Sequence, residues 1–84
     1  MFQIEFLPGA RKALQTIPRN VRELIVSKIE TVALAPFDTP SVRKLRGRDG
    51  WRLRVGAWRI IYTVDAARLT IVVLTIVTRG KAYR

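Results

Sequence analysis

With 84 residues, 49% of them hydrophobic, the chain is long enough for one small domain with its own core, which we expect to span residues 1–84. It contains no cysteine and no histidine. A disulfide framework, a thiolate metal site and a histidine general base are therefore excluded, and we expect no metal and no cofactor. Sixteen Lys and Arg residues outnumber six Asp and Glu residues, which gives a net charge of +10 at pH 7.

The positive charge is concentrated in the second half of the chain. Residues 1–42 carry a net charge of +1, whereas residues 43–84 carry +9. Because such an excess opposes compact folding through self-repulsion, it indicates a polyanionic partner. Nucleic acid is the first candidate, followed by an anionic membrane surface or an acidic protein segment. The same repulsion disfavours self-association, so we expect a monomer when the chain is free.

Neither end of the sequence predicts insertion into a membrane. The apolar run LTIVVLTIV is too short to span a bilayer. The opening MFQIEFLPGA lacks the basic start and the long apolar stretch of a signal peptide. We therefore expect a cytoplasmic protein.

The first half of the chain predicts one strand followed by two helices. FQIEF (2–6) alternates apolar and polar residues, as a strand does. Pro8 can occupy the first turn of a helix over residues 8–16. A longer helix follows Pro18, where the apolar residues recur every three or four positions and predict a buried stripe: Val21, Leu24, Ile25, Ile29 and Val32.

The second half predicts a loop and three strands. Pro36 and Pro40 bracket the loop, and the strands are expected at about 51–56, 58–64 and 68–77. The last strand is apolar on both faces, which favours a central position in the sheet. The predicted fold class is α+β, in the order β-α-α-β-β-β, with a two-helix hairpin packed on one face of an antiparallel sheet.

Strand alternation gathers arginine side chains on one face of this sheet. Arg52 and Arg54 lie on the side opposite Trp51, Leu53 and Val55. In the next strand Arg59 lies opposite the set Trp58, Ile60, Tyr62 and Val64, so the three arginines are expected to converge on the free face.

Two interpretations of this basic face stay open. It can be the solvated side of a half-buried sheet, which is commonly charged. Alternatively, it can bind phosphate, since like charges across strands are unfavourable and the loop RKLRGR adds four more bases. Three aromatic side chains lie on the apolar face of their strands: Trp51, Trp58 and Tyr62. We therefore expect them to pack in the core and not to stack on bases. The sequence has no glycine-rich phosphate loop and no Ser/His/Asp set.

The segment RKLRGRDGWRLRVGAWRIIYTV, followed by an apolar strand and VTRGKAYR, resembles the RelE/ParE superfamily of bacterial and archaeal toxins. The resemblance covers nearly the whole chain and implies the same β-α-α-β-β-β order. It implies a toxin of a type II toxin–antitoxin system. For the RelE branch it implies cleavage of mRNA in the ribosomal A site, without metal, with the ribose 2′-hydroxyl as nucleophile. The implied partners are the ribosome, mRNA and an acidic antitoxin that wraps the basic half.

The resemblance also implies roles for individual residues. Arg59 and Arg79 would hold the scissile phosphate, and Tyr83 would stack on a base or help to deprotonate the 2′-hydroxyl. Arg52 and Arg54 stand where RelE has lysines. Because arginine keeps its proton near neutral pH, Arg54 is expected to stabilise charge and not to transfer a proton. The remaining bases are expected to bind RNA: Lys44, Arg46, Arg48, Arg52, Lys81 and Arg84.

One departure from the family pattern bears on catalysis. Many relatives carry histidine just before the last arginine, where this chain has Thr78. Two further functions stay open on the same fold: a ParE-like inhibitor of DNA gyrase, and a module that binds RNA or antitoxin without catalysis. The combination of Arg59, Arg79 and Tyr83 favours the ribonuclease.

Overall fold

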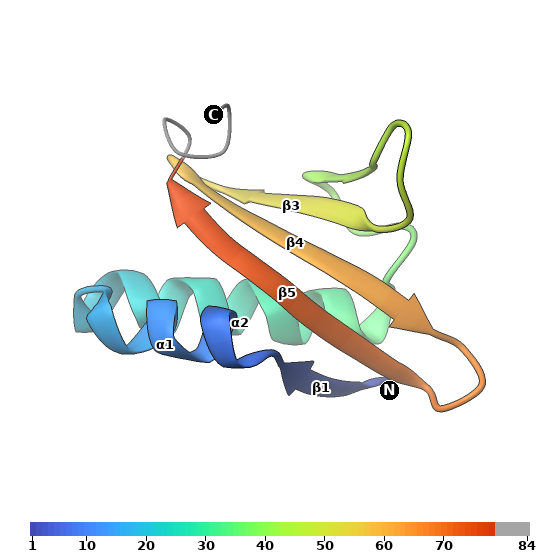
Figure 1. The fold of residues 1–84 in the computed structure, drawn as a ribbon, viewed down its shortest axis with the longest axis horizontal. Helices are drawn as coiled ribbons and strands as arrows, with labels where there is room; N and C mark the ends of the chain where they lie inside the picture. The colour runs from blue at the N-terminus through green and yellow to red at the C-terminus, as the bar shows by residue number, and fades with distance from the viewer. Residues whose placement is uncertain (79–84) are drawn as a thin grey trace.

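The computed structural model describes residues 1–78 of the chain, and Figure 1 shows two helices crossing one face of a twisted sheet. The elements, in chain order, are β1 (Gln3–Phe6), α1 (Pro8–Thr16), α2 (Arg19–Leu34), β2 (Val42–Lys44), β3 (Trp51–Val55), β4 (Trp58–Asp65) and β5 (Thr70–Thr78). Residues 79–84, which include the predicted site residues Arg79, Lys81, Tyr83 and Arg84, lie outside the described part.

The predicted α+β class is confirmed, and the structure adds two details. The sheet has the order β1-β5-β4-β3-β2, so β5 is an interior strand as its apolar faces predicted. It is antiparallel apart from β1, which runs parallel to β5. The predicted antiparallel pairing holds for β2 to β5, and the parallel pairing of β1 was not predicted because strand alternation carries no information on direction. The prediction also missed β2, whose three residues are too few for a periodic pattern.

Both helices begin where the prolines predicted. Pro8 lies in the first turn of α1, where its missing N–H would have no helical partner. Pro18 precedes α2, and the Arg22 side chain donates a hydrogen bond from Nη2 to the Ile17 carbonyl, 3.1 Å away, across the turn between the helices. Neither helix has the length and apolar character needed to cross a membrane.

The core lies between the two helices and the sheet. The predicted stripe of α2 is buried at Ile25, Ile29 and Val32, but Leu24 is exposed, so its assignment to the core is wrong. Leu24 lies at the margin of the buried stripe, where the spacing of apolar residues does not determine whether a side chain faces the core or the solvent. The inner strands of the sheet contribute seven buried residues: Leu53, Val55, Ile60, Tyr62, Ile71, Val73 and Ile76.

Tyr62 connects the core to the loop that follows α2. Its side chain is buried, as predicted, and its hydroxyl donates a hydrogen bond of 2.9 Å to the carbonyl of Pro36. A register shift in the β4–β5 ladder falls between Ile61 and Tyr62. Burial raises the pKa of the Tyr62 phenol, so this group stays protonated through the physiological range.

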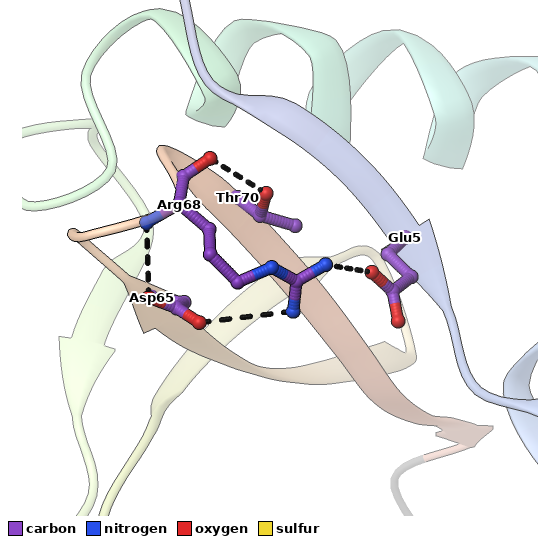
Figure 2. Close-up of polar contacts among 4 residues, drawn as sticks. All are labelled: Glu5, Asp65, Arg68 and Thr70. Carbon is purple, nitrogen blue, oxygen red and sulfur yellow. Dashed lines mark hydrogen bonds and ion pairs between the residues drawn. The ribbon is translucent and has the colours of Figure 1, made fainter.

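Arg68 ties the β4–β5 turn to β1 (Figure 2). Its guanidinium contacts the carboxylates of Glu5 at 3.1 Å and of Asp65 at 3.7 Å. Its backbone N–H donates to Asp65 Oδ1, and its carbonyl accepts a hydrogen bond from the Thr70 hydroxyl. These contacts hold the turn against the strand that pairs with β5.

Candidate nucleic-acid interface

Two pairs of arginines face one another across the strands of the basic face. Arg54 on β3 lies opposite Arg59 on β4, and Arg52 on β3 lies opposite Arg43 on β2. Leu53, between Arg52 and Arg54, is buried among the core residues, so its two neighbours direct their side chains to the face away from the helices. The predicted convergence of Arg52, Arg54 and Arg59 on one face is confirmed.

The two arginine pairs belong to two separate pockets. The smaller one, about 290 Å³, is lined by Arg54, Gly56, Ala57 and Arg59 at the β3–β4 turn. The larger one, about 620 Å³, lies at the edge of the sheet and is lined by Arg43, Lys44, Leu45, Arg46 and Arg52. Neither lining contains an acidic residue, so both pockets are suited to anions.

The exposure of the two arginines in the smaller pocket differs strongly. Arg54 is exposed, whereas Arg59 keeps only 3% of its surface accessible. We expected both on an open face, and for Arg59 that expectation is wrong. Its strand is flanked on both sides, with Arg54 and Val77 as register neighbours, whereas β3 lies beside the short edge strand. A guanidinium keeps its charge even when buried, so Arg59 is a fixed positive charge beside a more accessible one.

The β2–β3 hairpin presents two further bases at its tip. The Leu45 N–H donates to the Gly50 carbonyl at 3.0 Å and closes a turn in which Gly47 has φ +72° and Gly50 has φ +124°. Both values lie in a region that side chains disfavour and glycine tolerates. Arg46 and Arg48, in the turn, are exposed.

Two neighbouring bases of β2 line the larger pocket. Lys44, one of the predicted RNA-binding residues, is exposed, and its register partner is Trp51. Arg43 lines the same pocket but was absent from the predicted site. The signal for Arg43 is its place in the RKLRGR run. Its strand has only three residues, so the sequence shows no alternating pattern from which the direction of its side chain could be predicted.

The aromatic residues near the hairpin pack inwards. Trp51 and Trp58 are half-buried and pack against the core, as their parity predicted. The Trp51 ring lies 5.2 Å from the Phe37 ring, with 54° between the planes, so it is partnered within the fold.

The arginines of the two pockets offer electrostatic chemistry. Among residues 1–78, no three His, Cys, Asp or Glu side chains are grouped to hold a metal ion. Fixed guanidinium groups can bind phosphate oxygens in two parallel hydrogen bonds and stabilise charge that develops on them. Tyr62, the one tyrosine among residues 1–78, is buried in the core, and its hydroxyl donates a hydrogen bond to the Pro36 carbonyl.

Comparisons with known proteins show the family and the fold of this chain. Residues 4–83 match the family model described as the ParE toxin of the type II toxin–antitoxin system, parDE. The archaeal RelE of a RelE–RelB complex from Pyrococcus horikoshii OT3 superposes with a TM-score of 0.82 at 26% identity, covering 95% of this chain and 97% of that chain. The isolated E. coli RelE toxin gives 0.82 at 23% identity, covering 99% and 92%. Among curated proteins, no sequence matches.

Proposed function

This chain belongs to the ParE toxin family of type II toxin–antitoxin systems, within the RelE/ParE superfamily, and we propose that it cleaves mRNA on the ribosome. The observation that carries the proposal is the pairing of Arg54 with Arg59 in register at one pocket. These are positions to which the resemblance assigns catalysis. Fixed cations there suit a reaction whose transition state gathers negative charge on a phosphate.

The proposed reaction needs no group beyond the RNA and the side chains. The ribose 2′-hydroxyl loses its proton and attacks the adjacent phosphorus. The bond to the 5′-oxygen of the next nucleotide breaks, which leaves a 2′,3′-cyclic phosphate and a 5′-hydroxyl that takes up a proton. Arg54 and Arg59 stabilise the phosphoryl oxygens during the attack. Arg79 and Tyr83, which lie outside the described residues, are proposed to hold the phosphate and to assist proton removal.

The proposed partners follow from charge and from the relatives. The second half of the chain carries +9, which suits an acidic antitoxin segment as well as RNA. The similar E. coli RelE chain of the intact RelBE toxin–antitoxin complex superposes with a TM-score of 0.82 at 22% identity, covering 93% of this chain and 96% of that chain. We propose that the toxin is a monomer when free and that it acts in the cytoplasm, where ribosomes are.

Two observations favour other functions on this fold. The matching family model is that of ParE toxins, which supports inhibition of DNA gyrase as a second candidate. The low exposure of Arg59 supports a third, a surface that binds RNA or antitoxin without cutting, since a buried arginine must become accessible before it can contact a phosphate.

One pair of assays separates these functions. Purified toxin is incubated with ribosomes programmed with a defined mRNA, and the new 5′ ends are mapped by primer extension; a parallel reaction follows DNA supercoiling by gyrase. We expect new mRNA ends and unchanged supercoiling. Intact mRNA together with trapped gyrase–DNA complexes would favour the gyrase inhibitor, and neither effect would favour a binding module. Arg19→Ala, which removes an exposed base on α2, is the matched control for charge.

A further inference from the structure

Leu69, in the β4–β5 turn, combines two features that each lower the stability of a fold. Its φ is +49°, in the left-handed region that glycine and asparagine tolerate and leucine disfavours. Its side chain is 56% exposed, so a large apolar group faces water. The turn holds the residue in place, because its N–H donates to the Ala66 carbonyl and its carbonyl accepts from the Gln3 N–H. A strained and exposed leucine in a fixed turn points to a contact outside the domain.

Two further apolar side chains lie beside Leu69. Leu34, the last residue of α2, is 68% exposed, and Met1 is exposed as well. The Phe2 N–H donates to the carbonyl that precedes Leu34, at 2.9 Å. The following N–H donates to the Leu69 carbonyl at 2.8 Å, so the stretch directly after Met1 joins both leucines. Figure 1 shows the N-terminus, the end of α2 and the β4–β5 turn at the same end of the molecule. We call Met1, Leu34 and Leu69 the apolar end surface.

The charged residues next to the apolar end surface are mostly acidic. Four of the six acidic residues of the chain lie four positions from one of its members: Glu5, Glu30, Asp38 and Asp65. Within the same distance along the chain, the positive groups are the Met1 amino group and Arg68, which contacts Glu5 and Asp65 (Figure 2). An acidic rim on a chain of net charge +10 disfavours nucleic acid and anionic lipid at this end, and it favours a cationic partner.

The apolar end surface is separate from the basic face. Arg59 lies near the start of β4 and Asp65 at its end, so about 20 Å of strand separates the smaller arginine pocket from the β4–β5 turn. A partner bound at one of these places leaves the other open.

We propose that the apolar end surface binds a second protein, one that presents apolar side chains flanked by lysine or arginine. The apolar side chains of the partner would cover Leu34 and Leu69, and its flanking bases would face the acidic rim. An acidic segment such as the proposed antitoxin has the opposite charge, so the partner is a different protein. The inference does not depend on the proposed function, because it holds whether or not the chain cleaves mRNA.

The binding test measures the fluorescence anisotropy of a labelled helical peptide that carries leucine on one face, two flanking lysines and otherwise neutral side chains. Leu69→Asn removes the apolar group and relieves the backbone, since asparagine tolerates positive φ. We expect this variant to bind the peptide on the order of tenfold more weakly, the effect of one buried leucine. Its Tm should rise by about 3 °C, so unfolding cannot explain the loss.

Two matched pairs of variants locate the peptide. Leu34→Gln should weaken binding as Leu69→Asn does, whereas Leu24→Gln, an exposed leucine about 15 Å earlier along α2, should not. Glu30→Gln should weaken binding about threefold. Glu23→Gln changes the net charge by the same amount but lies farther from Leu34, so it should leave the affinity unchanged.

Several results would overturn the proposal: no binding of the peptide, wild-type affinity in Leu69→Asn, or displacement of the peptide by a saturating single-stranded oligouridylate. So would tighter binding of a matched peptide with glutamate in place of lysine. A dimer that sedimentation detects in the wild type and not in Leu69→Asn would assign the surface to a second copy of the chain instead. If wild-type toxin cuts no mRNA while Leu69→Asn still weakens peptide binding, the proposed function fails and the protein-binding surface stands.

Discussion

Arg54 on β3 and Arg59 on β4 lie directly opposite each other in register, yet Arg54 is exposed and Arg59 is 3% accessible. The pair combines a buried fixed charge with an accessible one at the same pocket. In the proposed function, Arg54 is therefore the member of the pair that a phosphate of the RNA would contact first.

Replacing Arg54 with lysine separates the effect of its charge on cleavage from the effect of its planar guanidinium group. Arg54→Lys keeps a positive charge but loses the planar fork that binds two phosphate oxygens at once. We expect single-turnover cleavage on programmed ribosomes to fall by about tenfold, on the order of one charged hydrogen bond. Arg54→Gln, which removes the charge and keeps a donor, should be slower than Arg54→Lys. Equal rates for the two variants would show that charge at this position is unimportant.

Gly50 supports the hairpin that carries Arg46 and Arg48. Its φ of +124° strains any side chain, and a Cβ would lie 3.1 Å from the Tyr62 carbonyl oxygen and 3.2 Å from Leu45 Cδ1. We expect Gly50→Ala to lower the free energy of unfolding by about 2 kcal/mol, measured by urea denaturation.

Gly9→Ala is the matched control for Gly50→Ala. Gly9 lies in α1, and a Cβ there would meet no atom within 4 Å. Because alanine favours the helix, this variant should raise the free energy of unfolding by about 0.5–1 kcal/mol. If both variants destabilise the fold equally, the backbone of Gly50 is not the cause.

The buried hydroxyl of Tyr62 predicts a dependence of stability on high pH. Burial raises the pKa of this phenol from its ordinary value of 10.0, so the folded state holds the proton more tightly than the unfolded chain. The resulting stabilisation is fully present below pH 10 and is lost as the pH rises above it.

Tyr62→Phe removes both the ionisation and the hydrogen bond to Pro36. At pH 7 the free energy of unfolding should fall by about 1 kcal/mol, the contribution of that bond. Between pH 9.5 and 11, its stability should fall less steeply than that of the wild type. Parallel pH profiles for the two proteins would contradict the assignment of the raised pKa to Tyr62.

Arg68 should contribute little to stability although it contacts two carboxylates. The Arg68 side chain is 61% exposed, and its partner Glu5 is 47% exposed, so solvent screens the ion pairs. We expect Arg68→Ala to lower the free energy of unfolding by about 0.5–1 kcal/mol at low salt and by less in 1 M NaCl. A loss that does not depend on salt would assign the effect to packing of the β4–β5 turn.

The sequence was most informative where side chains alternate in long strands. It placed Arg52 and Arg54 opposite the core because β3 has a clear period of two, and Pro8 and Pro18 set the starts of the helices. It could not show that β1 runs parallel to β5, since direction depends on the path of the chain. It also could not predict the burial of Arg59, which depends on the flanking strands, or the place of Arg43, whose strand has only three residues.

The measurement that tests the central claim most directly is the single-turnover rate of mRNA cleavage on programmed ribosomes at saturating toxin, compared between the wild type and Arg54→Ala. Arg54 is exposed, so its removal should leave the fold intact. We expect the wild type to cut the mRNA and Arg54→Ala to cut it on the order of a hundredfold more slowly, since a donor to the transition state is lost. Cleavage by Arg54→Ala at the wild-type rate, or no cleavage by the wild type, would contradict the account.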